Sequence, residues 1–541
     1  MKTRFKQYRK LLFFAACAVA VIAGGIYYFG IQQAFVPQPE GLASTQMWYL
    51  ILTHREKYVH YNIIYDAIMC VSGLLGGMSY FARRLASTLL YGIILALSLY
   101  LSLTKKKGKE RWYLLPLWAF FMIFIHTISS PSSYGIVYDP SGLVIELPYI
   151  YHNMPLIFAL ISMAILQCFQ RAAEKKKRFV LGGIGIVVVI YALLYTDLIY
   201  CAIFVAPLLI VLILKGFYND KTRRYMAPLL ALGVGLMLLT RILPGDFCAW
   251  LWSKTTVAGP YGGTIYGQNN WMNLVHLPEY IADYFQTIGE LFNIDFSGRP
   301  IISLYSILFL IRIVFVVIGY MIILKIIKNS VKGKAGQKGY DMLDEVLAWG
   351  FVVLSCAFMG AYGGHESSPR FFTALVPILT ILLCRNIGSF MREFLPVLEL
   401  IKYKKLFFGG IVGALCICQI EPVWSYQMVD NYREDCEAAI EYLRQWGVED
   451  EGWALAPYWL FPRLSAMTNG EIMFYYNEGQ AKRIYGEDAE IRYMVVGWEN
   501  NLVNQGLERF AYGSYEEMCE KYKTPIRAVD LDYVYVCDFG E

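Results

Sequence analysis

The sequence predicts a polytopic α-helical membrane protein that carries a small α/β domain at its C-terminal end. Of its 541 residues, 57% are hydrophobic and only 17% are charged, whereas soluble domains carry about 25% charged residues. The apolar residues form blocks, and a membrane span needs roughly 20 of them. Lys and Arg gather between alternate blocks. These observations exclude a simple soluble enzyme and a disordered chain.

Eleven apolar segments are predicted to cross the membrane. The first is long, and no small-residue cleavage site precedes a mature soluble domain, so we interpret it as an anchor rather than a signal peptide. The predicted spans are residues 11–31, 85–104, 112–130, 153–170, 179–196, 198–214, 226–243, 302–324, 345–363, 371–384 and 406–421.

The distribution of positive charge orients these spans. Because cytoplasmic loops are enriched in Lys and Arg, six basic segments that hold 29 of the 48 Lys and Arg are placed in the cytoplasm together with the N-terminus. With eleven spans, the region after the last span is then outside the plasma membrane. The six segments are 1–10, 105–111, 171–178, 215–224, 325–338 and 385–405.

Residues 62–82 are apolar enough to resemble a twelfth span. If they crossed the membrane, 24 of those 29 basic residues would move outside. Asp66 lies within the stretch, and a carboxylate at mid-membrane is costly. We therefore predict that 62–82 belongs to a long outer loop, 32–84, which holds amphipathic or re-entrant helices at the surface.

The chain is thus divided into a transmembrane domain, 1–424, and an extracytoplasmic domain, 425–541. The second domain has ten Lys and Arg against 22 Asp and Glu, a net charge of −12, while the rest of the chain is near +17. The pattern from Cys436 to Leu443 predicts an amphipathic helix, and the stretches 472–476 and 533–536 are typical of strands. The negative charge argues against binding nucleic acid or anionic lipid through this domain.

The cytoplasmic segments offer no site for a nucleotide, because they are short and contain neither a glycine-rich phosphate loop nor a Walker-type motif. The outer side is therefore the side on which we expect chemistry. It holds loop 32–84, a second large loop at 244–301 and the C-terminal domain. All six His residues lie in or near this side, without the spacing of a zinc site.

Three motifs in this order resemble the GT-C superfamily of membrane glycosyltransferases. The plan is closest to the protein O-mannosyltransferase and aminoarabinose-transferase branch, glycosyltransferase family 39. The motifs are Pro37-Gln-Pro-Glu40-Gly41 after the first span, the run from Leu75 through Arg83 and Arg84 to Gly92, and His365-Glu-Ser-Ser-Pro-Arg370-Phe-Phe-Thr-Ala-Leu-Val-Pro377 before a late span. Only one acidic residue, Glu40, stands where family members often have a pair.

The resemblance implies a GT-C-like fold and transfer of a sugar from a polyprenyl-phosphate donor to a glycan, lipid or protein acceptor. Glu40 would be the general base or a metal-ligating carboxylate, and Asp139 and Glu146 in the outer loop 131–152 are the next candidates. Each of these three could instead be an ordinary loop charge. Some members of the class hold a divalent metal ion through carboxylates, which is the cofactor that the resemblance allows.

In such a reaction the departing lipid phosphate carries negative charge, so we expect a cation at the depth of the lipid headgroups to stabilise it. Arg370 is the first candidate, because a guanidinium can bind a phosphate through two donors. Arg83 and Arg84 are further candidates. For all three, the alternative is a side chain that merely extends to the interface. Arg312 falls near the middle of span 302–324, where a charge must face protein or water, and a structural ion pair is favoured there.

Two other functions fit the same composition. A carrier or flippase for a lipid-linked glycan would also be polytopic, but the chain shows no convincing internal repeat. An inactive relative that serves as a scaffold in envelope assembly would explain the single acidic residue in the first outer loop. The plan and motifs favour the glycosyltransferase.

Overall fold

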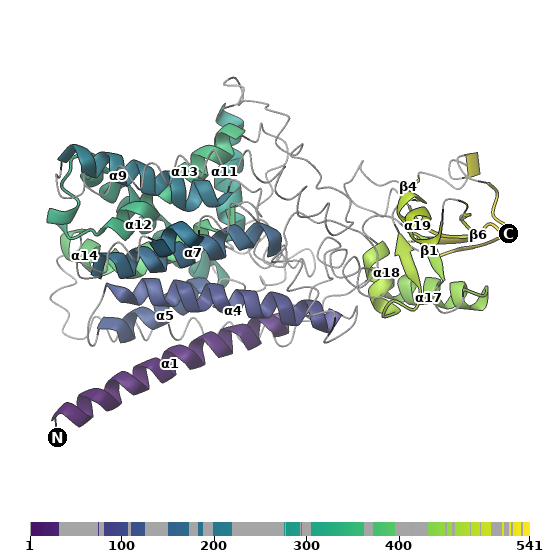
Figure 1. The fold of residues 1–541 in the computed structure, drawn as a ribbon, viewed down its shortest axis with the longest axis horizontal. Coiled ribbons are helices and arrows are strands. Elements are labelled where there is room, and N and C mark those ends of the chain that lie inside the picture. Colours follow the sequence, from purple (N-terminus) through teal and green to yellow (C-terminus); the bar gives the residue numbers. More distant parts are fainter. Residues whose placement is uncertain are drawn as a thin grey trace. The chain divides into compact units, whose positions relative to one another are not determined.

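The helices of the computed structural model follow the apolar blocks of the sequence (Figure 1). One compact unit contains the apolar helices and a second contains a C-terminal sheet. The structure describes residues 2–31, 74, 80–105, 110–124, 150–171, 182–187, 199–218, 275, 277–292, 294, 304–361, 372–394, 413, 431–448, 452–456, 460–475, 478–486, 488, 490–498, 511–512, 519–520, 523–531 and 534–540.

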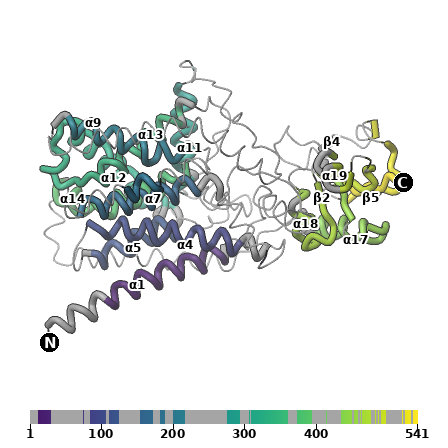
Figure 2. Tube along the Cα trace, viewed as in Figure 1, coloured from purple at the N-terminus to yellow at the C-terminus, as the bar shows by residue number. Residues whose placement is uncertain are grey.

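The helical unit contains nine described α-helices, a π-helical turn (η3) and a 3₁₀ turn (η6). The chain trace in Figure 2 shows α12, α13 and α14 together with α9, and residues of these helices contact one another. The elements are α1 (Lys2–Ile31), α4 (Tyr80–Thr104), α5 (Glu110–Met122), α7 (Ile150–Arg171), η3 (Cys201–Val205), α9 (Ala206–Tyr218), α11 (Leu277–Leu291), α12 (Leu304–Val331), η6 (Gly336–Lys338), α13 (Met342–Ala361) and α14 (Leu375–Phe394).

Among the described residues, five segments are long and apolar enough to cross a membrane, and the shorter apolar segment Cys201–Gly216 accompanies them. The prediction of a helical membrane protein is confirmed to this extent, while the number eleven stays a prediction. Predicted spans 226–243 and 406–421 lie outside the described residues, apart from residue 413. The five segments are Leu11–Phe29, Arg84–Thr104, Met154–Arg171, Phe309–Val331 and Leu375–Glu393.

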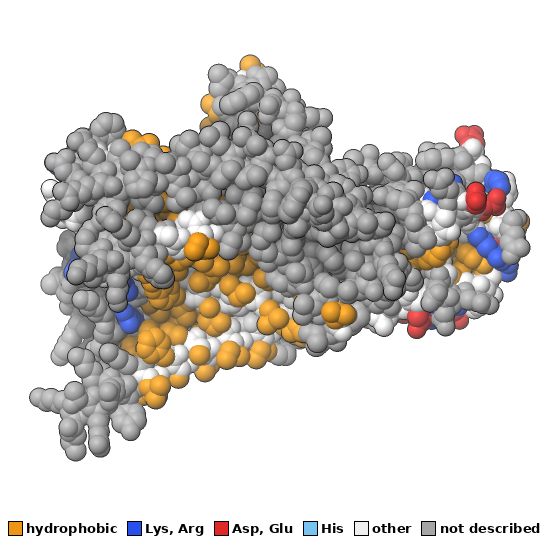
Figure 3. All heavy atoms as spheres, in the orientation of Figure 1, with side chains coloured by type: hydrophobic (Ala, Val, Ile, Leu, Met, Phe, Trp, Pro, Cys, Tyr) orange, Lys and Arg blue, Asp and Glu red, His pale blue; other side chains and the backbone are white. Residues whose placement is uncertain are grey.

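The surface of α1 explains its place in the unit. Large apolar side chains such as Leu12, Phe14 and Ile22 are more than 60% exposed, and Figure 3 shows hydrophobic side chains gathered along this helix and the neighbouring α4. The opposite face of α1 is buried against α4, where the ring centroids of Tyr28 and Tyr91 are 4.4 Å apart. An apolar exposed face is the surface that lipid covers in a membrane protein.

Two helices differ from the sequence-based expectation. Helix α14 does not end near residue 384 but continues to Phe394, and Arg385 within it is fully buried among polar partners rather than exposed in a loop. Helix α11 lies inside the predicted outer loop 244–301, to which we assigned no helix. Its buried residues Tyr280, Tyr284 and Ile288 recur every fourth position, which is the spacing of one helix face.

The C-terminal unit holds a mixed sheet with strand order β2-β1-β3-β6-β5, in which β1, β2 and β3 are parallel and β6 runs antiparallel to β3 and β5. The short strand β4 also pairs with β3. The elements are α17 (Asn431–Gln445), β1 (Trp453–Leu455), α18 (Phe461–Met467), β2 (Met473–Tyr475), α19 (Glu478–Tyr485), β3 (Tyr493–Trp498), β4 (Ala511–Tyr512), β5 (Arg527–Asp530) and β6 (Val534–Asp538).

Alternation along the strands builds a hydrophobic cluster on each face of this sheet. Val495 belongs to the cluster that includes α17 and α18 residues such as Leu443 and Leu464, whereas its neighbours Met494 and Val496 belong to the cluster that includes Ala481 of α19. The predicted helix at 436–443 is part of α17, and the predicted strands at 472–476 and 533–536 correspond to β2 and β6.

Candidate functional site

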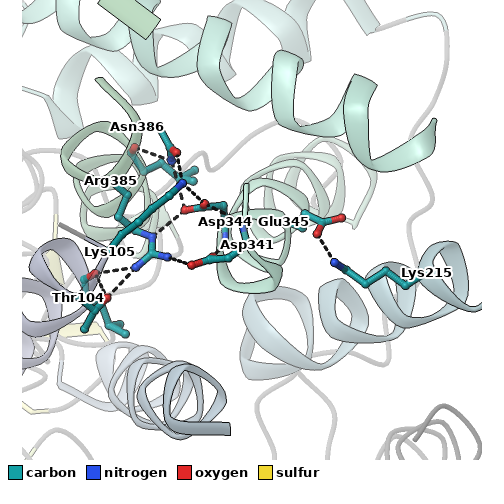
Figure 4. A network of polar contacts seen from close by, with 10 residues as sticks. Thr104, Lys105, Lys215, Asp341, Asp344, Glu345, Arg385 and Asn386 are labelled. Atoms are coloured by element: carbon teal, nitrogen blue, oxygen red, sulfur yellow. Dashed lines mark hydrogen bonds and ion pairs between the residues drawn. The ribbon is translucent and has the colours of Figure 1, made fainter. Parts of the chain in front are cut away.

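The most extensive polar arrangement in the described part of the helical unit is a buried group of charged and polar side chains (Figure 4). We call it the ionic cluster. It joins the C-terminal ends of α4, α9 and α12 to the N-terminal end of α13 and to the middle of α14. Its members are Thr104, Lys105, Lys215, Ser330, Asp341, Asp344, Glu345, Arg385 and Asn386.

Arg385 stands at the centre of the ionic cluster, and its side chain is fully buried. Its Nε donates to Oδ1 of Asp344 at 2.6 Å, and its Nη2 donates to Oδ2 of Asp341. Its Nη1 donates to the hydroxyl of Thr104 at 2.7 Å and to the carbonyl oxygen of Leu101 at 3.0 Å. One guanidinium thus ties α14 to the start of α13 and to the end of α4.

Lys105 completes the environment of Asp344. Its Nζ lies 2.5 Å from Oδ2 of Asp344 and 2.7 Å from Oδ1 of Asn386. The amide nitrogen of Asn386 in turn donates to Oδ1 of Asp344 at 3.2 Å. Lys105 also lies 5.5 Å from the ring centroid of Tyr340. Burial, reinforced by the carboxylates of Glu393 and Asp344, raises the pKa of Tyr340 to about 12, so this phenol stays neutral.

Glu345 extends the ionic cluster to two more helices. Its Oε1 lies 2.6 Å from Nζ of Lys215 at the end of α9, and its Oε2 accepts a hydrogen bond of 2.7 Å from Ser330 on α12. The cluster therefore contains three cations and three carboxylates, and its formal charge is zero. Balanced charge with hydrogen-bonded partners is the condition under which a buried ionic group is tolerated.

Local sequence explains why the carboxylates gather at the start of α13. Asp341 immediately precedes the helix, and its Oδ1 accepts a hydrogen bond of 3.0 Å from the backbone N–H of Asp344. Oδ2 of Asp344 accepts one of 3.0 Å from the backbone N–H of Asp341. This reciprocal arrangement satisfies free N–H groups at a helix N-terminus, where the helix dipole also favours negative charge.

Sequence reasoning did not identify the ionic cluster. Its basic members were counted only as cytoplasmic loop charges, and its carboxylates were not considered. The sequence contains one indication of the cluster, because Asp341, Asp344 and Glu345 stand together at the start of an apolar helix. Carboxylates in such a place need cationic partners, and the neighbouring segments are basic. Which cations they meet depends on residues 239 and 41 positions away along the chain, Lys105 and Arg385.

A second polar arrangement lies at the other end of α4. Ser87, Thr88 and Tyr91 follow Arg84 by three, four and seven positions, so the four residues lie on one face of the helix. Arg84 is partly buried, and the hydroxyls of Ser87 and Thr88 are buried without a hydrogen-bond partner in the described part of the chain. A methyl group on Gly25 of α1 would lie 3.7 Å from the side chain of Thr88, so α1 contacts α4 at this residue. We call Arg84, Ser87 and Thr88 the α4 stripe.

The structure describes only two of the predicted site residues, Arg83 and Arg84. Arg84 belongs to the α4 stripe. Arg83 precedes it in α4, but its side chain is not described. The remaining candidates lie outside the described residues, so the prediction that they share a site stays a prediction. These are Glu40, Asp139, Glu146 and Arg370.

Arg312 is buried in α12, with 1% of its surface exposed. Its Nη2 donates to the carbonyl oxygen of Phe124 at 3.2 Å, and its guanidinium carbon lies 5.8 Å from the ring centroid of Phe120 and 5.9 Å from that of Phe309. Phe124 follows the C-terminal end of α5, where carbonyl groups lack intrahelical partners and a cation is favoured. Arg312 thus stabilises a helix end, and the predicted ion pair stays a prediction.

Within the described residues, no three His, Cys, Asp or Glu side chains are grouped so that they could hold a metal ion. Comparison of the chain with protein-family models found no match, and comparison with curated protein sequences found none either.

Proposed function

We propose that the protein is a membrane glycosyltransferase, which moves a sugar from a polyprenyl-phosphate donor to a glycan, lipid or protein acceptor on the outer face of the plasma membrane. One observation carries the proposal furthest. The α4 stripe and the ionic cluster occupy opposite ends of one continuous apolar helix, which supports a phosphate ligand at one membrane surface and a fixed polar group at the other.

The length of α4 supports this placement. Arg84 and Lys105 are 21 residues apart, and α4 is continuous from Tyr80 to Thr104. At 1.5 Å per residue they are separated by about 31 Å along the helix axis, which is close to the hydrocarbon thickness of a bilayer, about 30 Å. Lys105 belongs to a basic segment that the charge distribution assigns to the cytoplasm. Arg84 then lies at the depth of the outer phosphates.

The chemistry of the α4 stripe suits a phosphate. A guanidinium can donate two parallel hydrogen bonds to phosphate oxygens and compensates their negative charge. Arg84 is the member of the stripe proposed to bind the phosphate, because the hydroxyls of Ser87 and Thr88 are enclosed. The resemblance to the GT-C membrane glycosyltransferases implies that Arg370 and Arg83 add positive charge near the phosphate. A cation at this position stabilises the lipid phosphate as it leaves the sugar.

The proposed reaction needs a base as well. The acceptor hydroxyl attacks the anomeric carbon, the bond from that carbon to the phosphate oxygen breaks, and a carboxylate takes the hydroxyl proton. Glu40 is the proposed base, with Asp139 and Glu146 as the further acidic candidates. A positioned general base contributes about 10²–10⁴-fold to the rate. The polyprenyl phosphate departs as the second product.

The experiment incubates the purified full-length protein with a panel of polyprenyl-phosphate sugars and identifies the products by mass spectrometry. Arg84→Gln should weaken binding of a polyprenyl phosphate about tenfold or more, since hydrogen bonds to charged groups contribute about 1.5–3 kcal/mol. Arg392→Gln is the matched control, because Arg392 is an exposed arginine of α14 beyond Arg385. Equal binding by the two variants would remove Arg84 from the site.

A second variant tests the chemical step. Glu40→Gln should abolish sugar transfer while leaving binding of the polyprenyl phosphate unchanged, because the amide cannot accept the proton. Unchanged turnover would remove Glu40 from the mechanism. Failure of every donor in the panel to give a product would count against the glycosyltransferase itself.

A further inference from the structure

The ionic cluster connects helices that are far apart in the sequence. Arg385 bonds α14 to α13 and α4, and Glu345 bonds α13 to α9 and α12. Arg171, at the end of α7, donates to the carbonyl oxygen of Thr104 and adds a sixth helix. These contacts bring together the ends of α4, α7, α9 and α12, the start of α13 and the middle of α14, and we call this region the basic end of the unit.

Separating the helices at the basic end would expose groups that are now completely enclosed. The side chains of Asp344 and Arg385 are both 0% exposed, and that of Glu345 is 2% exposed. Opening this end would separate these ion pairs from one another, so several charge-assisted hydrogen bonds would have to break in the same step. Moving α14 away from α13 and α4 would also break four hydrogen bonds of Arg385 together.

We propose that the ionic cluster is a permanent clamp, which keeps the basic end of the helical unit closed while ligands enter and leave by the opposite end or from the bilayer. A carrier that works by alternating access must open both ends in turn. A permanently closed basic end would therefore distinguish a protein that opens to one side only from a carrier that works by alternating access. It goes beyond the proposed function and would stand even if the protein transferred no sugar.

A native cysteine reports on the state of the clamp. Cys384 precedes Arg385 in α14 and is 0% exposed, and Cys201 at η3 is also buried. Cys168 and Cys356 are exposed. Full-length protein in liposomes of phosphatidylethanolamine and phosphatidylglycerol is treated with N-ethylmaleimide, and the modification of each cysteine is followed by peptide mass spectrometry. The measurement is made with and without undecaprenyl phosphate.

A closed clamp predicts that Cys384 of the wild-type protein reacts at least about 100-fold more slowly in both conditions than Cys168, which is exposed one turn from the end of α7, as expected of a group that reacts only when the structure opens. Asp344→Asn should accelerate the reaction of Cys384 about tenfold or more, because it leaves Arg385 with a weaker partner. The control Glu393→Gln should have no effect, since Glu393 is 58% exposed and pairs with Lys325 outside the cluster.

Two results would contradict the proposal that the basic end stays closed. One is rapid reaction of Cys384 in the wild-type protein, with or without undecaprenyl phosphate, because the basic end would then open spontaneously or on binding. The other is unchanged protection of Cys384 in the Asp344→Asn protein. If that variant fails to fold, which reaction of Cys201 would reveal, Lys105→Met provides the same comparison with one partner of Asp344 removed and Arg385 still paired.

Discussion

A methyl group on Gly350 of α13 would lie 2.6 Å from the carbonyl oxygen of Ile203 in η3. The two backbones are therefore in direct contact, and only a residue without a side chain fits between them. The π-helical turn of η3 ends where the N–H of Ala206 donates to the carbonyl oxygen of Cys201. Such turns interrupt the regular helix and change the direction of the carbonyl groups around them.

Gly350→Ala should therefore destabilise the helical unit. The methyl group meets backbone rather than a flexible side chain, so η3 and α13 must move apart, at a cost of about 1–3 kcal/mol in the free energy of unfolding. Titration of the purified protein with a denaturing detergent measures the change. Gly92→Ala in α4 is the control, because a methyl group there meets no atom within 4 Å; it should be neutral or stabilise by up to about 1 kcal/mol. Equal effects of the two variants would contradict the contact.

Removing a carboxylate from the ionic cluster should cost far more than removing one from the surface. Asp344→Asn leaves Arg385 and Lys105 with a neutral partner, and loss of one member of a buried ion pair costs about 3–5 kcal/mol. Glu393→Gln breaks the exposed pair with Lys325 and should cost less than about 1 kcal/mol. The same detergent titration compares them. A difference of less than 1 kcal/mol between them would show that the buried pair contributes little.

Helix α11 is attached to the unit through the hydroxyl of Tyr284. Its oxygen lies 2.8 Å from that of Tyr320 on α12 and 2.9 Å from Oγ of Ser355 on α13. Tyr284→Phe removes both contacts, each worth about 0.5–1.5 kcal/mol, and should accelerate amide hydrogen exchange in residues 277–291. Tyr320→Phe removes one of the two and should have a smaller effect. Exchange in α11 that is the same in both variants and the wild type would show that apolar packing alone attaches the helix.

The C-terminal unit should lose stability at alkaline pH through Cys537. Burial, with a smaller contribution from Cys519, raises the pKa of the Cys537 thiol well above its usual range. A raised pKa means that the folded unit keeps the proton, so stability is fully present below the ordinary thiol pKa, about 8.5, and falls as pH rises above it. The expected slope from this group is about −1.4 kcal/mol per pH unit.

Pulse proteolysis of the full-length protein in urea measures this slope, with the C-terminal fragments followed by mass spectrometry. Cys537→Ala removes the titrating group, so its stability should decline less steeply between pH 9 and 10 than that of the wild type. The difference in slope is diagnostic, because the cavity left by the smaller side chain lowers stability equally at every pH. Parallel slopes would show that Cys537 is not titrated on unfolding.

The apolar blocks of the sequence predicted helices well, because a segment that crosses a bilayer must satisfy its backbone hydrogen bonds internally and must be apolar outside. Helices α1, α4, α7 and α12 lie where predicted spans were placed. The error at α14 has a physical reason. Arg385 looks like a loop charge by composition, but Arg favours helices, and its partners Asp341 and Asp344 compensate the charge that α14 buries there. Helix α11 was missed because its apolar residues cover one face only.

The sequence by itself determined that this is a helical membrane protein with basic segments between its apolar blocks and an acidic C-terminal region. Those properties follow from the transfer energies of side chains, which each residue carries regardless of its neighbours. The tertiary structure decided which charges are buried and with whom. Ion pairs between Lys105, Asp344 and Arg385 depend on the distance between groups that are remote in the chain, so no local pattern specifies them. That pairing makes the basic end a candidate clamp.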